Sequence, residues 1–157
     1  MSAKTDRRLK EKKIGEVVNP RLIQAPADIS VQRALEVMRE NKSSYLVISE
    51  GKRVVGMFTE SDVTRKLLNK KSEWGRPVRD FMTADPIVLR LDDPVGRAVD
   101  LMAENDIYHV PLVNEKQELI NVLSVRTLIR FLAEFYPGEV YNIPPNPHQV
   151  HHTAEGG

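Results

Sequence analysis

The feature that most constrains the fold of this chain is an internal repeat. When the sequence is shifted by 64 positions, residues 14–41 align with residues 78–105, and eight of the 28 positions are identical. The identical positions include the apolar pair Met38 and Met102. Similarity at a fixed period is the sign of a repeat architecture, so the chain is expected to contain two copies of one structural unit.

Beyond this segment the second copy is expected to contain one inserted residue, near Ile107. With the shift raised to 65, residues 45–48 align with 110–113, and residues 54–59 align with 119–124. The similarity then continues to the end of the second unit, so the repeat covers most of the chain.

Each copy shows the same order of predicted elements: strand, helix, strand, strand, helix. Apolar residues in the first helix of each copy recur at i, i+3, i+4 and i+7, which predicts one buried stripe. A unit of this size with one apolar face is best buried against its twin. The fold class is therefore predicted to be α/β (α+β), with two β-α-β-β-α repeats packed as a pseudo-twofold pair. The predicted segments are extended stretches 22–24 and 87–89, turns 49–52 and 114–117, and closing helices 61–68 and 125–136.

The first helix of each copy carries a recognisable start signal. Ser30 is a favourable N-cap in the first copy, and Asp93 followed by Pro94 is a favourable N-cap and first-turn pair in the second. The resulting division of the chain is a basic N-terminal arm 1–13, a first repeat 14–69, a linker 70–77, a second repeat 78–136 and a proline-rich tail 137–157.

Composition excludes several classes of protein. The 23 Lys and Arg nearly balance the 22 Asp and Glu, and the formal net charge of +1 argues against general nucleic-acid binding. The absence of cysteine excludes disulfides, thiolate nucleophiles and Cys-ligated metals, and it fits a cytoplasmic location. Neither a secretory signal nor a membrane span is expected. The basic arm, in which Asp6 and Glu11 are interspersed, is expected to be a solvated helix.

The repeat resembles a tandem pair of CBS domains, the arrangement called a Bateman module, over about residues 14–134. Residues 56–62, Gly-Met-Phe-Thr-Glu-Ser-Asp, are similar to the Gly-apolar-apolar-Thr-x-x-Asp signature of that family. Residues 81–88 and 109–113 support the resemblance. It implies binding of AMP, ADP, ATP or S-adenosylmethionine in clefts between the repeats, a flat homodimer, and regulation of an attached or partner protein.

The signature residues have two interpretations. Thr59 lies where a strand meets a helix, a position that favours a phosphate, and the Asp62 carboxylate can accept hydrogen bonds from ribose hydroxyls. Thr59 at the N-cap with an acidic residue at the third helical position is also close to a capping box, which needs no ligand. Gly56 permits the close approach of a ligand or of a neighbouring strand.

The second copy departs from this signature. Ser124 and Thr127 replace the threonine and aspartate, and Asn121 replaces the glycine. We therefore expect one good nucleotide site, centred on Thr59 and Asp62, and a second cleft that is degenerate or altered in specificity. The first copy departs too, because Leu46 aligns with Pro111 of the second.

The remaining candidate ligand contacts follow from the resemblance. Ile23 and Val47, expected near adenine, also fit a core interpretation, and a solvated helix face explains the basic candidates equally well. The candidates are Ser61, Ile23, Gln24, Tyr45, Leu46, Val47 and Pro111, with Arg65, Arg126, Arg130 and His109 as partners for phosphate.

Two other regions are notable. The tail contains His148, His151 and His152, which we interpret as incidental rather than as a metal site, and its residues Val140, Tyr141 and Ile143 either dock on a neighbouring surface or are disordered. The closing helix of the second copy is apolar beyond one stripe, which predicts a dimer interface. The predicted interface residues are Leu128, Ile129, Phe131, Leu132, Phe135 and Tyr136, with Val63, Leu67 and Leu68 of the first copy.

Three hypotheses for function follow. The first is a regulatory adenine-nucleotide-sensing homodimer that acts on an unidentified partner protein in trans. The second is a constitutive dimerisation or scaffold module with a vestigial ligand site. The third is a nucleic-acid-associated protein that uses the basic arm. No motif of a catalytic triad, zinc protease or P-loop is present, so we expect no enzyme activity, no required cofactor and no metal.

Overall fold

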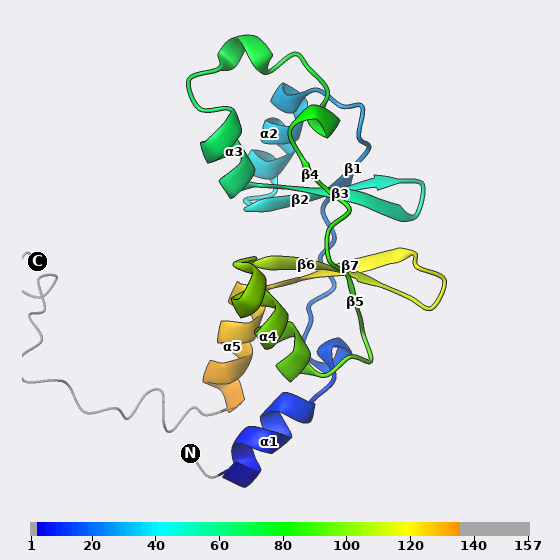
Figure 1. Ribbon diagram of the computed structural model, residues 1–157, viewed down its shortest axis with the longest axis vertical. Helices are drawn as coiled ribbons and strands as arrows, with labels where there is room; N and C mark the ends of the chain where they lie inside the picture. The colour runs from blue at the N-terminus through cyan, green and yellow to red at the C-terminus, as the bar shows by residue number, and fades with distance from the viewer. Residues whose placement is uncertain (1–2, 136–157) are drawn as a thin grey trace, which may run out of the picture.

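The computed structural model describes residues 3–135, and the two repeats form two sheets that face each other, with helices on their outer sides (Figure 1). The first sheet has strand order β1-β2-β3-β4, with β1 parallel to β2 and the other pairs antiparallel. Helices α2 and α3 cover it. The elements of this half are β1 (Gln24–Ala25), α2 (Val31–Glu40), β2 (Tyr45–Glu50), β3 (Arg53–Thr59) and α3 (Glu60–Lys66).

The second half repeats this arrangement. Its sheet has strand order β5-β6-β7, with β5 parallel to β6 and β6 antiparallel to β7. Helices α4 and α5 cover the side away from the first sheet (Figure 1). The predicted β-α-β-β-α order is therefore confirmed in both copies. The elements are β5 (Leu89–Arg90), α4 (Val95–Asn105), β6 (His109–Val113), β7 (Leu119–Ser124) and α5 (Val125–Phe135).

Each half is completed by the segment that begins the other repeat. Ile14, in the short helix η1 (Ile14–Glu16), is fully buried in the core of the second half. Val78, in the short helix η3 (Val78–Asp80), is fully buried in the core of the first half. Strand β4 (Thr83–Ala84) then joins the first sheet beside β3. The two repeats are thus interlocked rather than packed as separate units.

Hydrogen bonds around these exchanged segments show that the two halves are related by an approximate twofold axis. Each bond has a counterpart 64 residues away, as expected for a pseudo-twofold pair. The matched bonds are Ile14 N to Asp93 O (3.0 Å) with Val78 N to Ile29 O (2.8 Å), and Val95 N to Lys12 O (2.7 Å) with Val31 N to Arg76 O (2.9 Å).

Sheet register corrects the predicted position of the inserted residue. In β2 and β3 Tyr45 lies opposite Thr59, and in β6 and β7 His109 lies opposite Ser124. The shift of 64 therefore persists through β6, and the extra residue lies in the following turn, where Gln117 adopts a φ of 64°. A turn accommodates an added residue, whereas an insertion before β6 would turn its buried side chains to the other face.

As a consequence, two predicted equivalences were wrong. Tyr45 corresponds to His109 rather than to Val110, and Val47, not Leu46, corresponds to Pro111.

The predicted helix starts were right in one copy and wrong in the other. Ser30 is the N-cap of α2, and its hydroxyl accepts a hydrogen bond from Arg33 N at 3.1 Å. In the second copy the N-cap is Pro94, the equivalent of Ser30, and α4 begins at Val95. The Asp93 carboxylate instead accepts a hydrogen bond from Arg90 N at 2.8 Å, so it closes the preceding turn and does not cap the helix.

Gly56 allows a close approach of the segment that precedes β4. Gly56 pairs with Ala84, and a Cβ atom at position 56 would lie 2.4 Å from Met82 Sδ. Of the two roles predicted for this glycine, the structure shows contact with a neighbouring strand. At the equivalent position of the second copy, the buried Asn121 side chain donates a hydrogen bond to Asn19 O at 2.8 Å.

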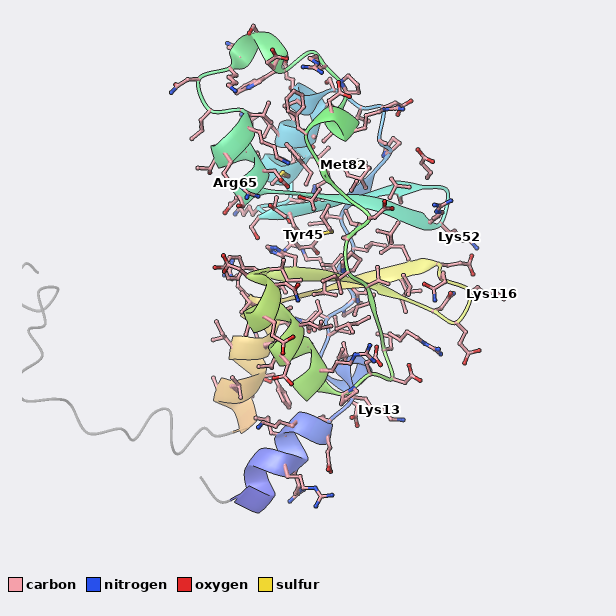
Figure 2. The ribbon with its side chains drawn as sticks, viewed as in Figure 1. Lys13, Tyr45, Lys52, Arg65, Met82 and Lys116 are labelled. Carbon is pink, nitrogen blue, oxygen red and sulfur yellow. The ribbon has the colours of Figure 1, made fainter. Side chains whose placement is uncertain are left out.

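The two sheets also contact each other at the ends of their hairpins. Leu119 N donates to Lys52 O at 2.7 Å, and Lys52 Nζ lies 3.5 Å from Glu118 Oε2. Figure 2 shows Lys52 and Lys116 at this end of the molecule, with Tyr45 between the sheets nearer the other end.

The basic N-terminal arm forms helix α1 (Ala3–Glu11), which packs on α4. Leu9 is buried, and the Cβ of Lys10 lies against Gly96. The predicted helix is therefore confirmed, but one side of it contacts the second half. No helix within residues 3–135 is long and apolar enough to cross a membrane.

The predicted dimer surface was partly wrong. Leu67 and Leu128 are buried in the cores of their own halves, so neither can face a partner. Leu68, Ile129 and Leu132 are exposed. The reason is that α3 and α5 pack on their sheets through one stripe, and only the residues beside that stripe remain at the surface. The predictions for Tyr136, the histidine tract and the proline-rich tail lie outside the described residues.

Candidate functional site

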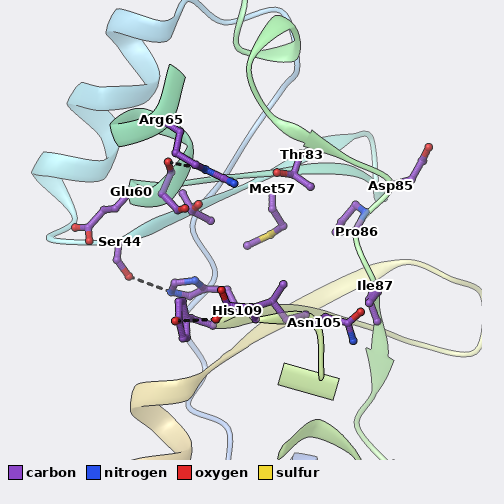
Figure 3. Close-up of a pocket in the computed structure, with 15 residues that line it drawn as sticks. Ser44, Met57, Glu60, Arg65, Thr83, Asp85, Pro86, Ile87, Asn105 and His109 are labelled. Atoms are coloured by element: carbon purple, nitrogen blue, oxygen red, sulfur yellow. Dashed lines mark hydrogen bonds between the residues drawn. The ribbon is translucent and has the colours of Figure 1, made fainter. Parts of the chain in front are cut away.

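A cleft of about 700 Å³ lies between the two halves. Figure 3 shows that β3 and α3 supply one wall, the connection from Thr83 to Ile87 a second, and the segment before β6 a third. We call this the first cleft. It is lined by Ser44, Met57, Thr59, Glu60, Ser61, Arg65, Thr83, Asp85, Pro86, Ile87, Asn105, Asp106, Ile107, Tyr108 and His109.

The signature residues Thr59 and Asp62 form a capping box. Asp62 N donates to Thr59 Oγ1 at 3.4 Å, and Thr59 N donates to Asp62 Oδ2 at 3.0 Å. The ligand-independent interpretation of this spacing is therefore present in the structure. Capping does not account for the second carboxylate oxygen of Asp62.

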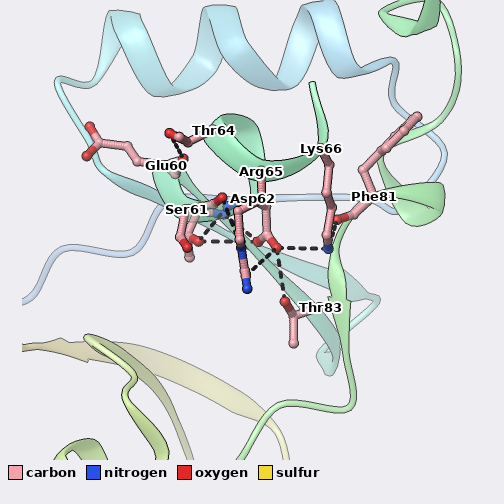
Figure 4. Close-up of polar contacts among 9 residues, drawn as sticks. Glu60, Ser61, Asp62, Thr64, Arg65, Lys66, Phe81 and Thr83 are labelled. Atoms are coloured by element: carbon pink, nitrogen blue, oxygen red, sulfur yellow. Dashed lines mark hydrogen bonds and ion pairs between the residues drawn. The ribbon is translucent and has the colours of Figure 1, made fainter. Parts of the chain in front are cut away.

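That oxygen is held by side chains from two elements (Figure 4). Lys66 Nζ lies 2.9 Å from Asp62 Oδ1, and the Thr83 hydroxyl donates to the same oxygen at 3.1 Å. Lys66 also donates to Phe81 O, so Asp62 and Lys66 together attach α3 to the segment that leads into β4. Asp62 is only 1% exposed, and it lies behind the cleft wall that Thr59, Ser61 and Arg65 form.

A second cleft, of about 190 Å³, lies on the other side of the approximate axis. Nearly all of its lining residues are the repeat equivalents of residues that line the first cleft. Ser124 replaces Thr59, for example, and Arg130 replaces Arg65. The lining residues are Asn19, Arg21, Lys42, Ser43, Ser44, Tyr45, His109, Val122, Ser124, Arg126, Thr127 and Arg130.

Ser44 and His109 line both clefts and separate them. Ser44 Oγ lies 3.0 Å from His109 Nε2 (Figure 3). The His109 ring lies 4.9 Å from the Tyr45 ring, centroid to centroid. Burial lowers the pKa of His109 to about 4, because the charged imidazolium would lose its hydration there. The imidazole is therefore neutral at pH 7.

Several predicted contact residues do not line either cleft. Ile23, Leu46 and Val47 are buried in the first core, and Pro111 is buried within β6. Gln24 is at the surface of β1, where its side-chain oxygen accepts a hydrogen bond from Ser49. The first core needs these apolar side chains, which agrees with the core interpretation of their pattern.

Other lining residues were missed by the sequence reasoning, among them Thr83, Asp85, Asp106, Arg21 and Lys42. None belongs to a recognisable motif for ligand binding. What they share is their position in the repeat. Residues 19 and 21 are the repeat equivalents of 83 and 85, and residue 42 is the equivalent of 106. Within residues 3–135 no cluster of three His, Asp or Glu side chains is placed to hold a metal ion.

Comparison with known proteins gives a consistent result. The family model for the CBS domain matches residues 14–69 and 78–134. A curated relative, an uncharacterized 17.7 kDa protein of Acidianus ambivalens, is 28% identical over 125 residues, which cover 79% of this chain and 75% of that protein. Other curated relatives are longer, and the matches cover from 21% to 61% of their length.

Two solved structures are similar to the chain. CBSX2, solved in complex with AMP, is 27% identical with a TM-score of 0.67, and the match covers 78% of this chain and 96% of that one. A CBS domain pair solved with 5′-methylthioadenosine and S-adenosyl-L-methionine is 20% identical with a TM-score of 0.70, and the match covers 77% and 99% of the two chains.

Proposed function

The chain belongs to the CBS-domain family, with two CBS domains side by side, and on that premise we propose that it is a regulatory module that binds an adenosine-containing ligand in the first cleft. The candidate ligands are AMP, ADP, ATP and S-adenosylmethionine. The module acts as a cytoplasmic homodimer on a partner protein in trans, and it has no catalytic role of its own.

The observation that carries this proposal is the first cleft itself. Its volume of about 700 Å³ lies within the range of roughly 300–1,000 Å³ that is typical of small-molecule sites. Its lining combines apolar side chains, such as Met57 and Ile107, with the hydroxyls of Thr59, Ser61 and Thr83. An adenosine ligand needs this combination, because the base requires apolar walls and the ribose requires polar partners.

The position of Asp62 suggests how a ribose would be recognised. Thr83 lines the cleft, and its hydroxyl is the donor to Asp62 Oδ1 on that side. A ribose hydroxyl that replaces the Thr83 hydroxyl would satisfy the same carboxylate oxygen, so Asp62 would exchange one donor for another. Binding would then loosen β4 from α3, which provides a physical link between occupancy and the relative position of the halves.

The ligands of related structures agree with this proposal. CBSX2 was solved with AMP, and the other CBS pair was solved with 5′-methylthioadenosine and S-adenosyl-L-methionine. All three compounds contain adenosine, and they differ in the group attached to the ribose. The expected common feature of ligands for this chain is therefore the nucleoside.

The test is calorimetry and thermal unfolding with AMP, ADP, ATP and S-adenosylmethionine. A ligand at 100 times its dissociation constant stabilises the folded state by about 2.7 kcal/mol. Ser61→Tyr, at an exposed position on the cleft wall, should fill the cleft and abolish the shift. Ser72→Tyr, at an exposed serine outside both clefts, is the matched control and should retain it.

One observation favours a second candidate function. Asp62 is satisfied by protein donors on both carboxylate oxygens, so the signature is stable without any ligand. A constitutive dimerisation or scaffold module would have this property. Absence of a thermal shift with all four compounds would favour the scaffold over the sensor.

A further inference from the structure

The two clefts have equivalent positions but different charge. Asp85 of the first cleft corresponds to Arg21 of the second, and Asp106 corresponds to Lys42. Ser61 corresponds to Arg126, so a neutral residue is also replaced by a cation. Only Arg65 and Arg130 carry the same charge at the same position. The approximate twofold axis that relates the backbones therefore does not relate the charges.

In the first cleft, acidic groups exceed basic ones. Glu60, Asp85 and Asp106 line it, against the single guanidinium of Arg65. Arg65 NH2 also lies 3.8 Å from Asp62 Oδ1, behind the wall, which offsets part of its charge. This cleft is suited to a ligand that is neutral or positively charged near these carboxylates, or that carries few negative charges.

The second cleft shows the opposite balance. Arg21, Lys42, Arg126 and Arg130 line it, and none of its described lining residues is Asp or Glu. No carboxylate within residues 3–135 lies within ion-pair distance of any of these four side chains. Arg21 donates to the backbone carbonyl of Asn41, which does not neutralise it. A concave site lined by one sign of charge concentrates the field and attracts counter-ions.

Neutral donors in the second cleft add to this effect. Ser124 Oγ lies 3.1 Å from Thr127 Oγ1, and both residues line the cleft. Thr127 occupies the position of Asp62, so the second cleft also lacks the buried carboxylate that lies behind the wall of the first. Helix α5 has 11 residues and begins beside these hydroxyls. The positive end of its dipole therefore lies at the second cleft and adds to the positive charge of the four cations.

We propose that the second cleft binds a compact, phosphate-rich group, either the di- or triphosphate of a nucleotide or free polyphosphate. Its volume of about 190 Å³ is below the range for a whole nucleotide, so the charged group and not the nucleoside occupies it. The inference deepens the proposed function and rests on it, because it assigns the two clefts different parts of ligand chemistry. The first cleft recognises adenosine, and the second recognises negative charge.

The test uses calorimetry on the full chain with inorganic tripolyphosphate, ATP, AMP and adenosine. Tripolyphosphate is expected to bind the wild type, and Arg126→Ser, which installs the residue of the first copy, is expected to weaken it roughly tenfold or more, because charge-assisted hydrogen bonds are lost. Arg79→Ser, at an exposed arginine that lines neither cleft, is the control and should leave tripolyphosphate affinity within about twofold of the wild type. Both arginines are exposed, so neither change threatens the core.

The outcomes separate the two proposals. Failure of tripolyphosphate to bind, or an equal loss in the Arg126→Ser and Arg79→Ser variants, would overturn the assignment of the second cleft, while binding of AMP or adenosine would leave the proposed function intact. If tripolyphosphate binds and depends on Arg126, but no adenosine compound binds, the proposed function fails and the anion site remains. ATP binding that is tighter than tripolyphosphate binding and is likewise weakened by Arg126→Ser identifies a nucleotide as the source of the phosphate, and the reverse order identifies free polyphosphate.

Discussion

Tyr45 and His109 occupy the same position in the two repeats, and their rings meet 4.9 Å apart at an angle of 43°. Residues related by a twofold axis contact each other only if they lie on it, so this pair marks the axis. The two clefts lie on either side of the pair. A change in the charge or size of either ring therefore acts directly on the contact between the two halves.

His109 is expected to make folding depend on pH. Its pKa is lowered to about 4 in the folded chain, against an ordinary value of 6.5. At a pH between these two values, the imidazole of the unfolded chain binds a proton and the imidazole of the folded chain does not. The contribution of the neutral His109 to the free energy of unfolding is therefore fully present above pH 6.5 and is lost as the pH falls towards 4. The loss is at most about 3 kcal/mol. Urea unfolding of the wild type and His109→Gln across pH 4–8 measures it, and parallel pH curves would contradict the assignment.

Asp62→Ala is expected to destabilise the chain in the absence of ligand by about 2–4 kcal/mol. The change removes the buried carboxylate that accepts hydrogen bonds from Lys66, Thr83 and the Thr59 amide. Chemical denaturation measures the loss. Glu73→Ala, which breaks an exposed ion pair with Arg76, is the control and should cost less than about 1 kcal/mol. Equal costs would show that the Asp62 network contributes little to folding.

Gly56→Ala is expected to cost about 1–3 kcal/mol, because the new Cβ would meet the Met82 side chain. In the double variant Gly56→Ala/Met82→Ala the two costs should not add, since removing the Met82 side chain removes the clash. Gly75→Ala, where nothing lies within 4 Å of a new Cβ, should be nearly neutral. Additive costs in the double variant would refute this contact.

Ile14→Ala is expected to cost about 2–4 kcal/mol, and to weaken both halves together. Ile14 packs in the second core, whereas the single tryptophan, Trp74, packs against the first. Because each half is completed by a segment of the other repeat, Trp74 fluorescence and far-UV circular dichroism should report the same shifted transition. A Trp74 transition that stays in place while the circular dichroism shifts would show that the halves unfold independently.

Ile129→Glu is expected to reduce dimerisation if α5 is the interface of the proposed homodimer. Ile129 is 60% exposed, and Leu132, one turn along, is exposed beside it. Static light scattering at micromolar concentration should give a dimer mass for the wild type and a monomer mass for the variant. Val99→Glu, at an exposed apolar position of α4, is the control and should remain dimeric. A monomer mass for the wild type would contradict the proposed homodimer.

Parts of the fold that depend on neighbours in the sequence were predictable from it. The repeat, the order of elements and the caps at Ser30 and Thr59 follow from residues within one helix or hairpin of each other. The start of α4 was not predictable in the same way. Asp93 has the chemistry of an N-cap, but the backbone between Arg90 and Asp93 turns so that its carboxylate closes that turn.

The walls of the candidate site also divide into one that neighbouring residues predict and others that only packing decides. The signature from Gly56 to Asp62 located one wall of the first cleft, because strand β3 and helix α3 are formed by adjacent residues. The opposite walls come from residues 83–87 and 105–109, which meet that wall only through packing between the halves. The charge difference between the clefts became visible only when register paired Asp85 with Arg21 and Asp106 with Lys42.

The sequence by itself therefore determined that the chain is two copies of one unit and in which order the helices and strands of each copy follow one another. The tertiary structure decided that each copy completes the core of the other, that Asp62 is buried behind the cleft, and that Tyr45 and His109 share the axis. The reason is physical. Propensities and caps act over a few residues, whereas these contacts join residues roughly 20 to 80 positions apart, and only the packing of both cores fixes them.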